Sequence, residues 1–120
     1  MAKVPILPSR GEKWLVDFDP AVGAEIQKLR PALVISLDSI GRVPLRMVTA
    51  LTDWKPFYLM FPWFVLIQAD RTNGLSKDSG ADAFQTKSLS LNRFRHRLGM
   101  LTDAHLDAVA TAIAVCVGTP

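Results

Sequence analysis

The chain has 120 residues, a length that suits one domain over residues 1–120 with a single hydrophobic core. Its apolar fraction of 49% and charged fraction of 21% exclude a disordered chain, and its net charge of +3 fits a polyanionic partner without requiring one. No apolar run is long enough to span a membrane or to act as a secretory signal, so we expect a cytoplasmic protein.

The first half of the sequence predicts three strands after a flexible arm over residues 1–10. Alternating apolar residues predict a strand over 13–20, and a polar loop over 21–29 follows. Pro31 disfavours helix at the residue before it, so Arg30 should be extended and lead into a buried strand over 31–36. A third strand is predicted over 45–52, followed by an unusually apolar loop over 53–62.

The second half predicts two further strands and a terminal helix. We expect strands over 63–69 and 82–89, separated by a turn-rich tract over 70–81, and then a basic segment over 92–101 with one helical turn and an edge strand. Apolar residues at helical spacing predict an amphipathic helix over 102–117, with Thr102 as N-cap and Gly118 after its end. The pattern favours a mainly β (α+β) protein, a small bent β-barrel of five to seven strands with a helix against it.

Several kinds of site find little support in the sequence. His96 and His105 are the only histidines, and neither has a second ligand at metal-binding spacing. No catalytic triad pattern and no glycine-rich phosphate loop is present, so we expect no metal and no cofactor. The lone Cys116 lies in an apolar run and is expected to be a small buried side chain.

Arg30 and Thr52 are the sharper candidates. Arg30 is either a surface arginine at a strand start or a guanidinium that Pro31 preorganises for a phosphate. Thr52 ends the third strand, where a threonine is more often a plain β-former or a turn residue than a functional group.

Aromatic and basic residues near these candidates also allow two interpretations. Trp54 and Lys55 follow in a loop, where they would stack a base and hold its phosphate or cover the end of the barrel. Residues 57–61 form an apolar run that we expect to be partly exposed and covered by a second copy or a partner protein. Residues 93–97 alternate arginines with Phe94 and His96, which in a strand gives a basic face that is usually solvated.

Two blocks of the sequence resemble the MazF/PemK family of toxin endoribonucleases, also called mRNA interferases. The stretch RGEKWLVDFDPAVGAEIQKLRPALVIS matches the family's opening pattern of G-[DE]-x-[WY], then D-x-[DN]-P-x-x-G-x-E and R-P-x-[LV]-V-[IL]-S. The later stretch GLSKDSGADAFQTKSLSLNRFRHRLGML is similar to the family's G-L-x-x-x-S and Q-x-[KR]-[ST]-[LVI] segment. The resemblance therefore runs over nearly the whole chain.

The resemblance implies an SH3-like barrel that forms a homodimer and cleaves single-stranded RNA without metal, by attack of the 2′-hydroxyl. It further implies a cognate antitoxin with an acidic, disordered tail, through which alone the toxin would contact DNA. Catalytic roles carry over to Arg30, Thr52 and Glu25, and whether Glu25 accepts a proton or holds Arg30 stays open. The candidate RNA contacts are Gln27, Lys28, Trp54, Lys55, Gln85 and Lys87.

Two alternatives to a nuclease remain. A gyrase-binding toxin with the same type of barrel places its function on a C-terminal Trp-Gly-Ile end, whereas this chain ends in VCVGTP. A catalytically inactive relative would instead bind RNA or a partner protein, and an RNA cleavage assay separates that case from an enzyme.

Overall fold

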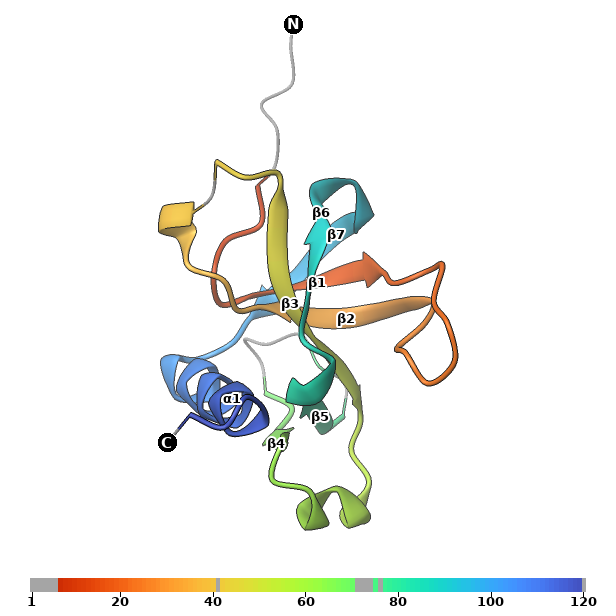
Figure 1. Cartoon of the computed structure of the whole chain (residues 1–120), viewed down its shortest axis with the longest axis vertical. Helices are drawn as coiled ribbons and strands as arrows, with labels where there is room; N and C mark the ends of the chain where they lie inside the picture. Colours follow the sequence, from red (N-terminus) through yellow and green to blue (C-terminus); the bar gives the residue numbers. More distant parts are fainter. Residues whose placement is uncertain (1–6, 41, 71–74, 76, 120) are drawn as a thin grey trace, which may run out of the picture.

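Seven strands and one α-helix make up the fold in the computed structural model, which describes residues 7–40, 42–70, 75 and 77–119. The predicted mainly β protein with a C-terminal helix is confirmed (Figure 1). In chain order the elements are β1 (Glu12–Asp17), β2 (Leu29–Val34), β3 (Leu45–Asp53), β4 (Phe64–Ile67), β5 (Ser79–Asp82), β6 (Lys87–Ser90), β7 (Phe94–Met100) and α1 (Asp103–Cys116).

All strand pairs are antiparallel and belong to one bent sheet. The order is β4-β5-β3-β2-β1-β7, and β6 also pairs with β3. The sheet does not close on itself, so the molecule is barrel-like rather than a closed barrel. No helix among the described residues is long and apolar enough to cross a membrane.

β3 is the strand that joins the two halves of the sheet. It pairs with β6 from Leu45 to Val48 and with β5 from Leu51 to Asp53. Val48 opposes Lys87 and Leu51 opposes Ala81. Between these two pairs β3 has two residues (49–50) and the facing chain has five (82–86), so three residues of the facing chain have no partner on β3. The surplus forms a 3₁₀ turn at Ala83–Gln85.

The prediction of one continuous strand over 82–89 was therefore wrong. Its apolar and β-favouring residues do form strands on both sides of the turn, but a ladder cannot absorb three unpaired residues without leaving the sheet. Thr49 and Thr86 hydroxyls lie 2.7 Å apart across this break and hold the turn against β3.

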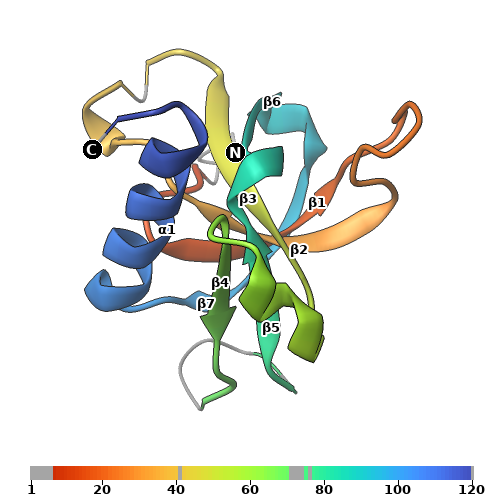
Figure 2. The ribbon, with the colours of Figure 1, turned by 60° about the horizontal axis from the view of Figure 1, so that its bottom comes forward.

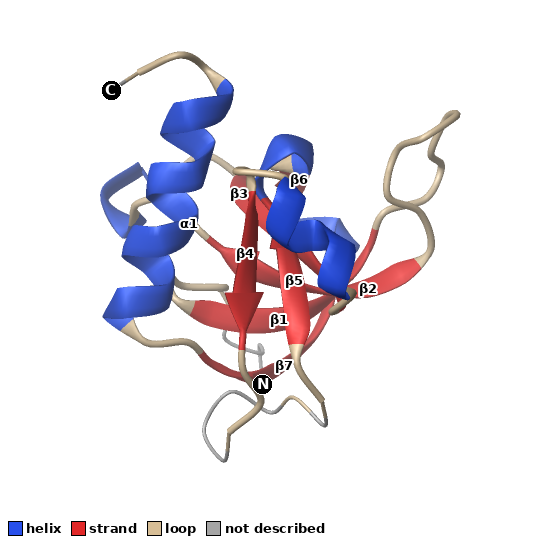
Figure 3. Cartoon of the chain, turned by 90° about the horizontal axis from the view of Figure 1, so that it is seen from below, coloured by secondary structure: helices blue, strands red, loops and turns tan. Residues whose placement is uncertain are grey.

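Each face of the sheet buries its own hydrophobic cluster, as the period-two pattern requires. Trp14, Val16 and Ala32 belong to the first cluster, and Leu33 and Leu51 belong to the second. Helix α1 covers the second cluster with Leu106 and Val109, and Figure 3 shows it lying along β4 on one side of the molecule.

The terminal helix begins and ends as predicted. The Thr102 hydroxyl accepts a hydrogen bond from the His105 amide, and Gly118 follows the helix with φ +75°. The prediction for Cys116 was wrong, because its side chain is exposed. Ala112 is the last buried residue of α1, and Cys116 lies one turn further along the same face, where the sheet no longer covers it.

The predicted flexible arm is only partly within the described residues, since 1–6 lie outside them. Within the described part of this arm, residues 8–10 contact the rest of the fold. Pro8 is buried and its carbonyl accepts a hydrogen bond from Arg46 Nε at 2.8 Å, while the Arg10 amide donates to Asp38 Oδ1 at 2.8 Å. These bonds tie the chain to the sheet before β1 begins.

The basic segment forms the predicted helical turn and edge strand, as a 3₁₀ turn at Leu91–Arg93 and β7. Two of its arginines are engaged by carboxylates of β1, Arg95 with Asp17 at 2.9 Å and Arg97 with Glu12 at 2.7 Å. Phe94 turns inward and contacts Trp14 edge to face. Much of this positive charge is thus neutralised along the β1–β7 edge.

The apolar loop contains a 3₁₀ helix, Pro56–Met60, with an exposed aliphatic tip. Tyr58 stacks on Phe64 with ring centres 3.9 Å apart, and both rings lie over Gly80 of β5. Leu59 and Met60 remain 79% and 80% exposed, which confirms the predicted partial exposure.

Candidate active site

A pocket of about 200 Å³ opens where β2 and β3 part, and we call it the fork pocket. The β2–β3 ladder ends at the pair Ala32–Ala50, whereas β3 continues as a partner of β5 from Leu51. The strands therefore diverge and leave space between them. The fork pocket is lined by Lys13, Arg30, Pro31, Leu51, Thr52, Asp53, Leu75, Lys77, Ser79 and Leu98.

The fork pocket brings together two of the three predicted catalytic residues, Arg30 and Thr52. Continuing the β2–β3 register two residues past Ala32–Ala50 places Arg30 opposite Thr52, on the same face. The Arg30 side chain is exposed, and its Nε donates to the carbonyl of Gln27 at 3.3 Å. The remaining guanidinium donors can therefore turn toward a ligand in the pocket.

One buried polar atom of this pocket lacks a hydrogen-bond partner among the described residues, and a second polar side chain is nearly covered. Thr52 Oγ1 is buried and forms no hydrogen bond with any described residue. Lys13 is only 1% exposed, and no hydrogen bond or ion pair of its ammonium is found among the described residues. Burial therefore lowers the pKa of Lys13 from its ordinary value of 10.5.

The charged lining of the fork pocket favours an anion. Lys13, Arg30 and Lys77 contribute positive charge against the single carboxylate of Asp53. Asp53 and Lys77 form a surface ion pair at 3.0 Å, so the uncompensated positive charge comes from Lys13 and Arg30. A phosphate group fits this balance.

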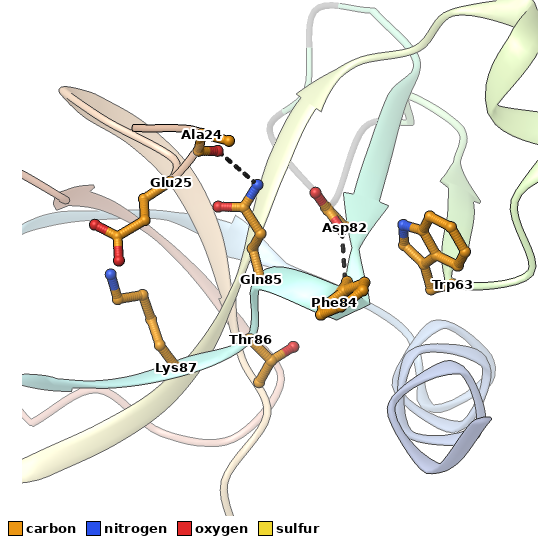
Figure 4. A pocket seen from close by; sticks show the side chains of 8 residues that line it. All are labelled: Ala24, Glu25, Trp63, Asp82, Phe84, Gln85, Thr86 and Lys87. Atoms are coloured by element: carbon orange, nitrogen blue, oxygen red, sulfur yellow. Dashed lines mark hydrogen bonds between the residues drawn. The ribbon is translucent and has the colours of Figure 1, made fainter. Parts of the chain in front are cut away.

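A second and larger pocket, of about 520 Å³, holds a different set of predicted residues, and we call it the loop pocket. Figure 4 shows Glu25 from the β1–β2 loop pointing toward Lys87 of β6, with Gln85 between the loop and the 3₁₀ turn. The loop pocket is lined by Ala24, Glu25, Trp63, Asp82, Phe84, Gln85, Thr86 and Lys87. It shares no lining residue with the fork pocket.

Gln85 fastens the β1–β2 loop to the sheet. Its Oε1 accepts a hydrogen bond from the Ile26 amide at 2.6 Å, and its Nε2 donates to the Ala24 carbonyl at 3.2 Å. The loop otherwise reaches out from the sheet (Figure 2). The Gln85 amide is thus occupied by backbone on both sides of Glu25.

The carboxylates of the loop pocket have different surroundings. Glu25 is exposed and accepts a hydrogen bond from the Val22 amide at 2.7 Å. Asp82 is 7% exposed, and burial raises its pKa although the Phe84 amide donates to it. Trp63 and Phe84 meet edge to face with ring centres 5.7 Å apart, so this pocket combines acidic and aromatic groups.

The other predicted contact residues lie around the two pockets. Gln27 and Lys28 are exposed at the end of the β1–β2 loop, and Lys28 has φ +68°, a conformation that non-glycine residues rarely adopt. Trp54 is half-buried and its ring meets Tyr58 edge to face, while Lys55 is exposed before the 3₁₀ helix. The nine predicted site residues therefore do not form one cluster. Two line the fork pocket, three line the loop pocket, and the remaining four lie outside both linings.

The fold and these residues match a family of known proteins. The family model of the PemK-like, MazF-like toxins of type II toxin–antitoxin systems matches residues 9–117. The chain belongs to this family. It is 33% identical over 108 residues to a protein named endoribonuclease MazF9 from Mycobacterium tuberculosis, covering 87% of this chain and 91% of that one.

Solved structures of family members have the same fold. MazF from Deinococcus radiodurans superposes with a TM-score of 0.82 at 23% identity, over 96% of this chain and all of that one. An endoribonuclease in complex with its cognate antitoxin, from a mycobacterial species, superposes with a TM-score of 0.72 at 21% identity, over 94% and 97% of the two chains.

The family resemblance did not point to every residue in the pockets. Lys13 was missed because it lies on the polar side of an alternating strand, which indicated solvent. Its burial follows from the pairing of Lys13 with Leu33, which places the lysine on the sheet face of the second hydrophobic cluster, and no local pattern shows this. Asp82, Trp63 and Phe84 were missed because the 3₁₀ turn that exposes Phe84 was predicted as strand.

No group of three or more His, Cys, Asp or Glu residues in the described ranges could hold a metal ion.

Proposed function

We propose that this family member is a sequence-selective endoribonuclease that cleaves single-stranded RNA without a metal ion, as the toxin of a toxin–antitoxin pair. The observation that carries the proposal is the pairing of Arg30 with the unpartnered, buried Thr52 hydroxyl in one positively charged pocket. A buried hydroxyl without a partner is costly, and a bound phosphate would supply the missing hydrogen bond.

The reaction uses the 2′-hydroxyl of the RNA as nucleophile, which is the group that distinguishes RNA from DNA. It attacks the adjacent phosphate, the bond to the 5′-oxygen breaks, and the products carry a 2′,3′-cyclic phosphate and a 5′-hydroxyl. Negative charge develops on the phosphate oxygens, where Arg30 stabilises it and Thr52 fixes the orientation of the group. Arg30 stays protonated at neutral pH and is therefore a clamp rather than a base.

Residues of the loop pocket and its rim bind the RNA on either side of the scissile phosphate. Glu25 and Lys87 face one another across the loop pocket, and Gln85 holds the loop in place. Gln27, Lys28, Trp54 and Lys55 contribute exposed amide, ammonium and aromatic groups nearby. Glu25 lines a different pocket from Arg30, which favours a role in holding the loop and the substrate.

The proposed partners are a second copy of the chain and an antitoxin. The exposed apolar tip of Phe57, Leu59 and Met60 offers a surface that a partner would cover. The mycobacterial neighbour whose structure contains its cognate antitoxin supports the same assignment. We place the protein in the cytoplasm, with DNA contacted only through the antitoxin.

The test uses the purified protein free of copurified antitoxin. It should cut long, mixed-sequence single-stranded RNA in excess chelator and leave the DNA of matching sequence intact. Arg30→Ala and Thr52→Ala should abolish cleavage, whereas Arg42→Ala, which removes an exposed charge from the β2–β3 connection, should retain it. Intact RNA with the unmodified protein would refute the nuclease assignment.

A further inference from the structure

Lys28, the last residue before β2, is strained, and the proposed function uses only its ammonium. Its φ of +68° lies in the left-handed region, where a side chain is crowded against the backbone. The surrounding chain nonetheless holds it there. The Lys28 amide donates to Asp19 Oδ1 at 2.9 Å, and its carbonyl accepts from the Phe18 amide at 2.9 Å. Strained residues that are fixed in this way are concentrated at functional sites.

The peptide group between Gln27 and Lys28 connects Asp19 to Arg30. Its N–H is the group that donates to Asp19 Oδ1, and its carbonyl accepts a hydrogen bond from Arg30 Nε at 3.3 Å. This peptide is trans and therefore planar, with its N–H and C=O pointing in opposite directions. The two hydrogen bonds lie on opposite edges of one rigid unit, so a carboxylate that fixes one edge also fixes the other.

The strain at Lys28 explains why this peptide needs a carboxylate. Without one, Lys28 would leave the left-handed region, because any other allowed φ is less crowded for a residue with a side chain. A change of φ at Lys28 together with ψ at Gln27 rotates the peptide plane and turns the Gln27 carbonyl away from Arg30. Among the described residues, that carbonyl is the one acceptor that the Arg30 side chain has.

Asp19 is held in turn by the β1–β7 edge. Its amide donates to Asp17 Oδ1 at 3.0 Å, and its carbonyl accepts a hydrogen bond from Arg93 Nη1, which also donates to the Asp17 carbonyl at 3.2 Å. The Asp17 carboxylate is engaged by Arg95 of β7 at 2.9 Å. The Asp19 carboxylate is therefore fixed to the sheet and does not depend on the outer part of the loop.

We propose that Asp19 is a positioning residue that sets the direction of the Arg30 guanidinium through the Gln27–Lys28 peptide, an inference that rests on the nuclease function proposed above. With Nε committed to the Gln27 carbonyl, the guanidinium plane is set and its terminal N–H groups are left for the phosphate. The carboxylate also polarises the peptide, which makes its carbonyl a stronger acceptor.

The indirect connection preserves the charge of Arg30. Asp19 and Arg30, both within the described residues, form no ion pair with each other. A direct ion pair would occupy the guanidinium donors and neutralise the charge that the phosphate needs. With a peptide group between them, Asp19 orients Arg30 without competing with the substrate for it.

The experiment measures cleavage of an oligonucleotide that contains a site mapped on long RNA. Asp19→Ala should lower kcat by about 10–10²-fold with KM nearly unchanged, because misplacing a positioned group by about 1 Å has effects of this size. Asp19→Asn keeps an oxygen acceptor for the Lys28 amide and should stay within about threefold of the unmodified protein. Asp38→Ala is the matched control and should cleave normally, since it removes another exposed carboxylate that accepts a backbone amide, that of Arg10 at 2.8 Å.

Lys28→Gly provides a rescue that distinguishes positioning from general loosening of the loop. Glycine adopts a positive φ without steric cost, so the peptide can keep its direction without the carboxylate. When both proteins carry Lys28→Gly, the fall in kcat caused by Asp19→Ala should shrink to about threefold or less. If Asp19 merely stiffens the loop, the added flexibility of glycine should enlarge the fall instead.

The contact itself is tested by NMR on the protein without RNA. Hydrogen exchange of the Arg30 Nε–H should accelerate about three- to tenfold in Asp19→Ala, because its hydrogen bond is loosened. The same exchange rate should not change in Asp38→Ala. Melting temperatures of all variants show that each one is folded at the assay temperature.

Three results would overturn the positioning role. They are an undiminished kcat in Asp19→Ala, a fall of equal or greater size in the Lys28→Gly background, and unchanged exchange of the Arg30 Nε–H in Asp19→Ala. If the unmodified protein cuts no RNA, it is the nuclease function that fails. The exchange measurement then still decides whether Asp19 holds the Arg30 guanidinium.

Discussion

The fork pocket and the loop pocket differ in the elements that build them as much as in their charge. The fork pocket takes side chains from β1, β2, β3, β5 and β7, and its uncompensated charge is positive. The loop pocket takes them mainly from the β1–β2 loop and the 3₁₀ turn after β5, with two carboxylates against one lysine. Strand frames fix geometry more tightly than loops do, so the first pocket suits bond breaking and the second suits recognition.

The largest expected effect is the loss of chemistry in the fork pocket. Arg30→Ala should lower kcat by about 10²–10³-fold, because one preorganised group that stabilises transition-state charge is removed. Glu25→Gln in the loop pocket should act mainly on KM or on the choice of cleavage site. Steady-state kinetics on a mapped RNA site measure both. Equal losses of kcat in the two variants would contradict the assignment of bond breaking to the fork pocket and recognition to the loop pocket.

Crowding beside the fork pocket gives the next effect. A Cβ on Gly80, which opposes Thr52, would meet Tyr58 at 3.1 Å and Phe64 and Trp54 at 3.3 Å. Gly80→Ala should therefore lower the free energy of unfolding by about 1–3 kcal/mol, as overpacked sites do. Urea denaturation measures it, and an unchanged midpoint would mean that the aromatic loop moves aside freely.

Gln85→Ala should loosen the loop pocket and leave the fork pocket intact. Two hydrogen bonds to loop backbone are lost, each contributing about 0.5–1.5 kcal/mol. Hydrogen exchange of the Ile26 amide should accelerate, while that of β2 amides such as Val34 should not. If both regions exchange faster, the loop and the fork are coupled and cannot be treated as separate sites.

The smallest effect concerns the stability cost of the buried Lys13. Because its pKa is lowered in the folded state, the unfolded chain binds the proton more readily, and wild-type stability rises as pH approaches 10.5. Lys13→Met removes this penalty, so it should be more stable at neutral pH by about 0.5–2 kcal/mol, in the range of single stabilising substitutions. The advantage should shrink between pH 7 and 10.5. Thermal melts of both proteins across this pH range measure the difference in stability. A difference that does not change with pH would contradict a buried lysine with a lowered pKa.

Local signals in the sequence were sufficient for most of the fold. Pro31 set the extended entry to β2, and Thr102 and Gly118 marked the ends of α1, because caps and proline act on their immediate neighbours. The break between β5 and β6 could not be predicted, since it follows from a mismatch with β3, more than thirty residues away.

The candidate site shows the same division. Family motifs pointed to Arg30 and Thr52, and the register of β2 and β3 explains why they meet. The position of Glu25 beside Lys87 instead of Arg30 depends on the Gln85 contacts to the loop. The burial of Lys13 depends on the face of the sheet that it shares with Leu33 of the second hydrophobic cluster. Both are tertiary facts that no short motif contains.

The three surplus residues at Ala83–Gln85 have a consequence for how such a protein can vary. Both flanking ladders are fixed by β3, so the turn between them is a place where length and side chains can change while the sheet keeps its register. Phe84 and Gln85, which line the loop pocket, lie in that turn. Insertions or deletions there would alter what the loop pocket accepts without moving Arg30 or Thr52, so substrate preference can diverge while the cleaving residues stay in place.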